Sequence, residues 1–399
     1  TLFPYTTPIR RLCTALRSAA LAAAVGLSGC ALQPAQTLPP VTTLLADSSF
    51  AAPTQPISAD AVMQLSPAMQ RYLDEQIRPR LRHQNARDAL LGALYTRSDL
   101  QLLYDDSATR TAAQAFEARA GNCLSLVIMT AALARHLELP VIFQSVEVDD
   151  AWSRGQGLLL AAGHVNLVLS ERPVDRARGL GVSNAMTVDF LPPDVVRCRR
   201  TSVIDESRIV AMFMNNRAAE TLAQGDLDGA YAWARAAALQ DPGFQSATIT
   251  LGVIYHRRGL LPSAEAAFRH ALRREPGNTQ ALADLAAVLK DQGRGPEAEQ
   301  VRQTLVRLES VAPFHYFDLG RAAVQRGDNE AGRVWLQREL RRDPDYHETH
   351  YWLGLAYRGL GDLPAAQRHL SLAMTNSTTR GDHDLYAAKL DRLQALKRP

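Results

Sequence analysis

Five glycines in the second half of the chain recur at a constant spacing of 34 residues: Gly225, Gly259, Gly293, Gly327 and Gly361. Three prolines keep the same period: Pro242, Pro276 and Pro344. Repeats of this length are typical of stacked structural units. Glycine suits the end of one helix because it adopts a left-handed backbone, and proline prevents the next helix from continuing. The spacing therefore predicts a stack of helix pairs, each covering the apolar face of its neighbour.

One copy of the repeat carries the clearest residue pattern. Its positions are Leu251-Gly252, Tyr255, Gly259, Ala264, Phe268, Ala271 and Pro276. This pattern resembles the tetratricopeptide (TPR) repeat, with Thr248 in place of the usual first Trp. The resemblance implies an all-α TPR solenoid of about five repeats over residues 206–399, with a C-terminal capping helix. The alternative is an unrelated helical bundle.

The same resemblance implies a groove, built from the first helices of the repeats, that binds a protein or peptide partner. The matching positions are His256, Lys290, Phe317, Arg321, Tyr351 and Arg358. Basic and aromatic side chains suit an acidic or C-terminal peptide segment. Arginine is abundant throughout the chain, however, so a few basic side chains on one face are also compatible with an ordinary solvated surface.

Residues 59–205 carry no repeat, and their pattern changes from helical to strand-like. An apolar helix is expected directly after Gly121-Asn122, with Cys123 in its first turn. Three strands are expected after it, at 141–148, 157–171 and 185–193, the second containing His164 and the third Asp189. A thiol at a helix start lies near unpaired N–H groups, which stabilise the thiolate. A nucleophilic cysteine also needs a base and a group that orients the base, and adjacent strands can supply both.

Two local patterns strengthen this interpretation: Arg119-Ala120-Gly121-Asn122-Cys123-Leu124-Ser125 and Gly163-His164-Val165-Asn166. The segment resembles the transglutaminase-like (papain-related) fold, an α+β domain of helices and a small antiparallel sheet. The resemblance implies Cys123 as nucleophile, His164 as base and Asp189 as the orienting acid. Asn122, or the backbone N–H of Cys123, is a candidate for holding a developing oxyanion. Leu124 and Asn166 depart from the better-known enzymes of the family, where an aromatic residue and a Trp are frequent, which argues against cross-linking activity.

Each of these residues also has an ordinary structural interpretation. A single buried cysteine is usually a small apolar residue, and a histidine in an apolar strand is usually structural. The transglutaminase-like fold also occurs as a binding module. Cys198 lies among arginines but has no base in a matching pattern, so we interpret it as a spare thiol. The alternative is a disulfide between Cys198 and Cys123, which would block the proposed nucleophile.

The N-terminal residues 1–29 read as a signal peptide, with three arginines followed by a short apolar run. Leu27-Ser28-Gly29-Cys30 resembles the bacterial lipobox, which implies lipidation of Cys30 and anchoring to a membrane. Ala31 then points to the outer membrane, with the protein facing the periplasm. The alternative is a secretory signal with an incidental cysteine. Residues 30–58 are rich in Pro, Thr and Ser, which predicts an extended tether rather than a packed element.

Charge and motifs exclude several functions. The net charge of +3 belongs to residues 1–29, because the remainder carries 41 basic and 41 acidic residues. A chain with no net charge and no known nucleic-acid-recognition motif is not expected to bind nucleic acid. CxxC and HExxH patterns are absent, so neither a metal nor a cofactor is expected.

Two function classes remain. The first is a membrane-anchored envelope cysteine hydrolase or acyltransferase acting on an amide bond, with the repeats recruiting the partner. The alternative is a non-catalytic TPR scaffold or adaptor lipoprotein.

Overall fold

The computed structural model describes residues 39–395, except for 54–55, 96–99, 101, 147–151, 156–157, 162, 178–184, 191–199 and 309–313. The predicted signal peptide 1–29, the predicted lipidation site Cys30 and the thiol of Cys198 lie outside the described residues. Within the described residues, no helix combines the length and the apolar character that crossing a membrane requires.

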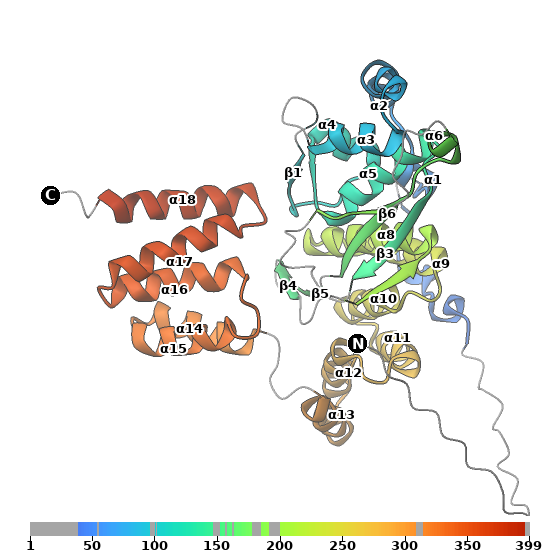
Figure 1. Ribbon diagram of the computed structural model, residues 1–399. Helices are drawn as coiled ribbons and strands as arrows, with labels where there is room; N and C mark the ends of the chain where they lie inside the picture. Colours follow the sequence, from blue (N-terminus) through green and yellow to red (C-terminus); the bar gives the residue numbers. More distant parts are fainter. Residues whose placement is uncertain are drawn as a thin grey trace, which may run out of the picture. The chain divides into compact units, whose positions relative to one another are not determined.

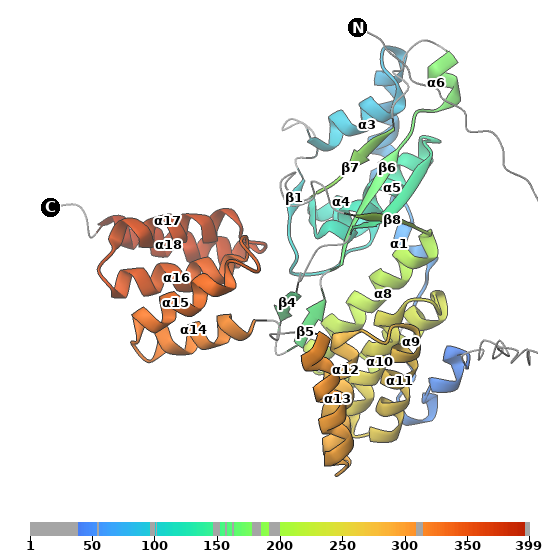
Figure 2. The ribbon, with the colours of Figure 1, turned by 60° about the horizontal axis from the view of Figure 1, so that its bottom comes forward.

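A small antiparallel sheet and one buried helix organise the first part of the chain. The four strands lie in the order β7-β6-β3-β8, with bounds β3 Val141–Val146, β6 His164–Leu169, β7 Met186–Val188 and β8 Thr201–Ile204. Helix α5 (Cys123–His136) packs against β6 and β3 (Figures 1 and 2). Every residue from Leu124 to Ala134 is buried. A helix that is apolar almost all round is a core helix, and α5 is therefore the centre of this domain.

Shorter elements surround this centre. The helices are α1 Asp60–Met63, α2 Pro67–Tyr72, η3 Leu73–Ile77, η4 Arg78–Arg82, α3 Ala86–Tyr95, α4 Ala112–Ala118 and α6 Pro173–Ala177. The strands are β1 Leu103–Tyr104 with β2 Ala120–Gly121, and β4 Trp152–Gly155 with β5 Leu158–Ala161. The region 157–171, expected as one strand region, therefore holds two strands. Asp189 follows β7 instead of lying inside a strand.

The predicted helical repeat stack is confirmed. Its helices are α8 Glu206–Ala223, α9 Leu227–Gln240, α10 Gln245–Arg258, α11 Leu261–Arg274, α12 Thr279–Asp291, α13 Gly295–Leu308, α14 His315–Gln325, α15 Asn329–Glu339, α16 His347–Gly359, α17 Leu363–Thr375 and α18 Arg380–Ala395. The five periodic glycines all have a positive φ, between 77° and 86°. A methyl group at Gly259 would meet no atom within 4 Å, so the backbone conformation alone explains the glycine there.

A second set of glycines is explained by packing between the two helices of a pair. A methyl group at Gly252 would lie 2.6 Å from the ring of Phe268, and one at Gly354 would lie 2.8 Å from Leu370. Both contacts are closer than real side-chain atoms approach, so these glycines let the paired helices pack at short range.

The apolar core of the described residues divides into three clusters. The largest runs from Val41 through α5 and the sheet to Ala298 in α13. The second contains Phe314, Phe317, Leu336 and Leu353, and the third Ala366, Leu370, Leu390 and Leu393. Helices α8–α13 therefore share a core with the sheet domain, whereas α14–α18 are held by smaller clusters.

One expectation is wrong for part of the N-terminal segment. Residues 39–51, expected to form an extended tether, instead pack against α9–α11 through the 3-10 turns η1 (Val41–Leu44) and η2 (Asp47–Ser49). The reason is that the prolines are followed by apolar side chains, Val41 above all, which is buried in the main core cluster.

Candidate functional site

His164 and Asp189 are brought together by the pairing of two neighbouring strands. His164 begins β6, and β6 pairs antiparallel with β7, which ends just before Asp189. Nε2 of His164 lies 2.8 Å from Oδ1 of Asp189. Asn166 lies two residues after His164, on the same face of β6, and its Nδ2 donates to Oδ2 of Asp189 over 2.9 Å. Both oxygens of the carboxylate are therefore held by residues of β6.

Cys123 opens helix α5 and lies beside the same histidine. It is a free, half-buried thiol. Nδ1 of His164 is buried and has no hydrogen-bond partner among the described residues. Burial lowers the pKa of His164, but the hydrogen bond to Asp189 and the proximity of Cys123 outweigh it and raise the pKa to about 9. This raised pKa favours a protonated imidazole next to Cys123 at neutral pH.

Tyr104 is a further side chain next to Cys123 that the sequence did not reveal. Parallel pairing of β1 with β2 places Tyr104 opposite Gly121, two residues before the cysteine. Burial raises the pKa of the Tyr104 hydroxyl, and the charge of Cys123 adds to the effect. The phenol therefore stays protonated and is available as a hydrogen-bond donor. The two short strands carry no periodicity from which their pairing could be read.

Gly121 is explained by the tight turn that precedes α5. A methyl group at this position would lie 2.7 Å from Cβ of Ser125. The side chain of Asn122 then caps the helix, because its Oδ1 accepts from the backbone N–H and the hydroxyl of Ser125 over 2.9 and 2.8 Å. Its Nδ2 donates to Oγ1 of Thr109 over 2.9 Å. Capping is thus the role that the structure gives Asn122, and its contribution to an oxyanion site stays a prediction.

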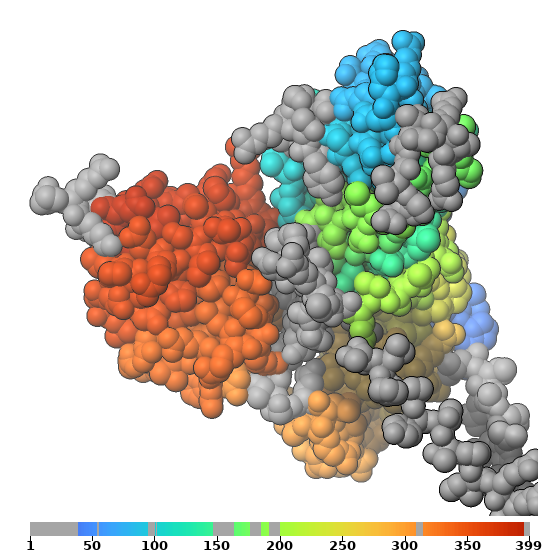
Figure 3. Space-filling model, in the orientation of Figure 1, coloured from blue at the N-terminus to red at the C-terminus, as the bar shows by residue number. Residues whose placement is uncertain are grey.

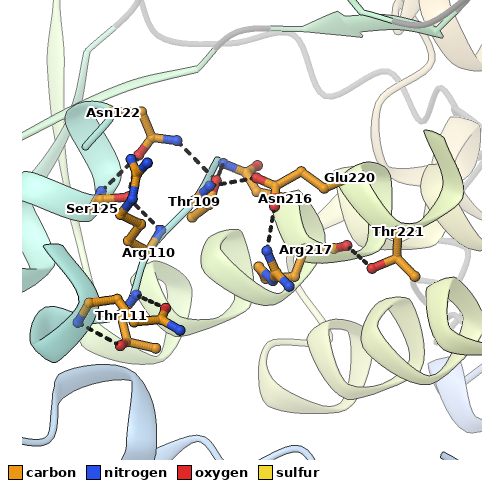
Figure 4. A network of polar contacts seen from close by, with 10 residues as sticks. Thr109, Arg110, Thr111, Asn122, Ser125, Asn216, Arg217, Glu220 and Thr221 are labelled. Carbon is orange, nitrogen blue, oxygen red and sulfur yellow. Dashed lines mark hydrogen bonds and ion pairs between the residues drawn. The ribbon is translucent and has the colours of Figure 1, made fainter. Parts of the chain in front are cut away.

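A polar network connects this cap with the first repeat helix, α8 (Figure 4). The backbone N–H of Thr109 donates to Oε1 of Glu220 over 2.7 Å, and Asn216 donates to the Thr109 hydroxyl over 3.3 Å. Glu220 is also paired with Arg217 at 2.7 Å. The loop before α4 therefore ties the helix that carries Cys123 to the repeat stack.

The predicted partner-binding groove residues fall on four helices. His256 in α10 pairs with Asp291 in α12 at 2.7 Å, and Lys290 in α12 is exposed. Tyr351 in α16 stacks on Tyr386 with 5.0 Å between ring centroids, and Arg358 is exposed near the end of α16.

Phe317 does not meet the requirement of an accessible groove residue. Its ring is fully buried and belongs to the core cluster with Phe314 and Leu336. Arg321 lies over the Phe317 ring at 5.6 Å and contacts Asp318 at 3.3 Å. The repeat period places Phe317 on the correct helix, but the packing between the paired helices turns its side chain inward.

No group of three or more His, Cys, Asp or Glu side chains in the described part of the chain is arranged to hold a metal ion.

Comparison with known families identifies the repeats. The sequence model of the tetratricopeptide repeat matches residues 279–303, 313–338 and 347–371. Cellulose synthase operon protein C of Pseudomonas fluorescens (strain SBW25) is 28% identical over 141 residues, which are 32% of this chain and 11% of that protein. The chain thus spans about a tenth of the length of this relative.

Solved TPR structures are similar to about half of the chain. MamA is 20% identical and covers 43% of this chain and 93% of its own, with a TM-score of 0.25. YrrB, described as a TPR protein with an unusual peptide-binding site, is 22% identical over 45% of this chain and 92% of its own, with a TM-score of 0.25. A thermophilic TPR protein of Thermus thermophilus, TTC0263, is 21% identical over 45% of this chain and 98% of its own, with a TM-score of 0.28. From the family match, the chain contains tetratricopeptide repeats, a module that supports binding between proteins.

Proposed function

We propose that this protein is a TPR adaptor that holds a protein or peptide partner. The observation that carries the proposal is the match of three successive segments between residues 279 and 371 to the TPR model. The expected ligand is an acidic or C-terminal peptide segment, because Lys290 and Arg358 present exposed positive charges on first helices.

Site-specific photo-crosslinking in cells tests this proposal. A photoreactive residue replaces Arg358, and in a matched variant it replaces Arg302, a similarly charged and exposed residue on the second helix α13. We expect a discrete crosslinked partner from position 358 and none from position 302. Equal, diffuse crosslinking from both positions would contradict a partner site on the first helices.

A second candidate function is cysteine-dependent cleavage or transfer at an amide bond by a transglutaminase-like domain. The observation that favours it is the 2.8 Å contact between His164 and Asp189 with Cys123 beside the ring. The Cys123 thiolate attacks the carbonyl carbon, and His164 gives its proton to the leaving amine. Water then attacks the thioester, returns a proton to His164 and releases the acid and the thiolate.

Alkylation of Cys123 across a pH series tests this second function. We expect rapid labelling by iodoacetamide at neutral pH, and in His164→Ala we expect labelling only near the ordinary thiol pKa of about 8.5. The same pH profile in both proteins would remove the basis for nucleophilic chemistry at Cys123.

The location that we propose is the periplasmic side of the outer membrane, with the chain anchored through lipid on Cys30. The lipobox-like tetrad supports this proposal. Fractionation of cells that produce the full chain or its Cys30→Ala variant tests it. The variant should move to the soluble fraction, and its retention in the membrane fraction would contradict anchoring at this residue.

A further inference from the structure

Residues 41–51, which we call the docked segment, lie along the repeat helices α9, α10 and α11. In Figures 1 and 2 the segment runs in blue beside these helices, and in Figure 3 it forms a blue patch against their yellow surface. Val41 is buried, and Leu44, Leu45 and Phe50 pack against the main core cluster. The segment therefore contacts the repeats in the way that a bound peptide contacts its receptor.

Asp47 is the polar centre of the contact. Its Oδ1 accepts from the hydroxyl of Tyr231 over 2.6 Å and from Nε of Arg235 over 2.8 Å, and its Oδ2 accepts from Nη2 of Arg235 over 3.2 Å. These hydrogen bonds hold the pKa of the Asp47 carboxyl below its usual value. A forked guanidinium selects a carboxylate, so this pair distinguishes Asp from neutral residues.

Phe50 is the aromatic anchor of the contact. Its ring stacks on Tyr231 with 4.0 Å between centroids and an interplanar angle of 11°. The guanidinium of Arg258 lies 5.1 Å from the centroid of the same ring. Stacking and cation–π contact together favour an aromatic side chain three residues after the acid.

Side chains of the repeats also bind the backbone of the docked segment. The backbone N–H of Ala46 donates to the Tyr231 hydroxyl over 3.0 Å, and the carbonyl of Leu44 accepts from the Tyr255 hydroxyl over 2.9 Å. The carbonyl of Ser49 accepts from Arg258 over 3.2 Å, and the N–H of Ala51 donates to Asp228 over 3.0 Å. Such contacts do not depend on the peptide's side chains, so they supply affinity while Asp47 and Phe50 supply specificity.

We propose that the face of α9–α11 is a peptide-binding site, that residues 41–51 are its resident ligand, and that it accepts peptides carrying Asp followed three residues later by Phe. The hydrogen-bonding side chains on the receptor side all come from the repeats. They are Tyr231, Arg235, Tyr255, Arg258 and Asp228. The site differs from the predicted groove positions and does not depend on a partner binding there. A covalently joined ligand acts at an effective concentration in the millimolar range, so a free peptide competes well only after the connection is cut or the joined segment is weakened by substitution.

The test uses the full chain with a protease recognition sequence inserted between Pro53 and Thr54. After cleavage, a fluorescein-labelled peptide of residues 39–53 is added in excess, and its binding is followed by fluorescence anisotropy. We expect exchange of the resident segment for the labelled peptide. Phe50→Ala should make the peptide compete about tenfold more weakly. Asp47→Ala should weaken competition about two- to fivefold, because the Asp47–Arg235 pair is partly exposed. Ser48→Ala, at an exposed position without a side-chain hydrogen bond among the described residues, should compete as well as the parent.

A second measurement needs no cleavage. The uncut chain with Asp47→Ala and Phe50→Ala together should bind the labelled peptide more tightly than the unaltered chain does, because its own segment is weakened. Adding Arg235→Ala should abolish this gain. Equal competition by the parent and Asp47→Ala peptides would overturn the proposal. So would loss of helical circular dichroism on cleavage, because it would make the segment an integral part of the fold.

Discussion

The contacts of His164 with Asp189 and Cys123 lead to a quantitative prediction of how protein stability depends on pH. Its pKa rises from 6.5 to about 9 in the folded protein. Since a tenfold change in proton affinity is worth about 1.4 kcal/mol, protonation of His164 stabilises the fold by about 3 kcal/mol. A raised pKa gives stability that is fully present below pH 6.5 and is lost as the pH rises through about 9. We therefore expect the free energy of unfolding to fall by about 3 kcal/mol through this window.

Urea denaturation at pH 6, 7.5, 9 and 10 measures this effect, with the His164→Gln variant as reference because glutamine does not titrate. The difference between the unaltered chain and the variant should be largest at pH 6 and should decrease towards pH 10. In Cys123→Ala the decrease should be smaller, because Cys123 contributes part of the shift. A difference that stays constant from pH 6 to pH 10 would refute the raised pKa of His164.

Three further substitutions test the packing and charge described above. Gly252→Ala forces a methyl group against the ring of Phe268 and should lower the free energy of unfolding by about 1–3 kcal/mol, with partial recovery on adding Phe268→Leu, measured by urea denaturation. Burial raises the pKa of Asp284 to about 6, and its Oδ2 has no hydrogen-bond partner among the described residues. Asp284→Asn should therefore stabilise the protein by up to about 3 kcal/mol above pH 6 and have no effect near pH 3, as thermal denaturation at both pH values will show. Glu220→Gln removes the charged acceptor of the Thr109 N–H and should cost about 1–2 kcal/mol in stability, measured from the urea midpoint.

Matched variants separate these effects from general damage. Gly277→Ala adds a methyl group with no neighbour within 4 Å and should not destabilise the protein. Asp291→Asn and Glu299→Gln alter carboxylates that are about half exposed and should change stability by less than about 0.5 kcal/mol. Equal losses at Gly252 and Gly277, or an Asp284→Asn gain that is independent of pH, would contradict the reasoning.

The repeats could be predicted because one backbone requirement recurs. Each periodic glycine ends its part of the repeat with a positive φ, and this requirement stays visible in the sequence. The closeness of His164 and Asp189 could also be predicted from the sequence, because the ends of neighbouring antiparallel strands lie close together.

Other features depend on contacts that a local pattern does not encode. Tyr104 reaches Cys123 through parallel pairing of two very short strands, and Asp47 meets Arg235 across 188 residues of sequence. Phe317 lies on the expected helix, but its ring packs with Phe314, Leu336 and Leu353 in the core and not in a groove.

The division of the apolar core implies two levels of local stability along the repeats. Helices α8–α12 each contribute several buried side chains to the large cluster that includes α5 and the sheet, so the amides on their buried faces should exchange with solvent only when that core opens. Helices α14–α18 rest on two clusters of four buried residues each, which places them at the low end of the opening free energies. A ligand that binds α14–α18 should therefore restrict the motion of these helices. Slower amide exchange in α14–α18 would report the binding even if the protein's average structure did not change.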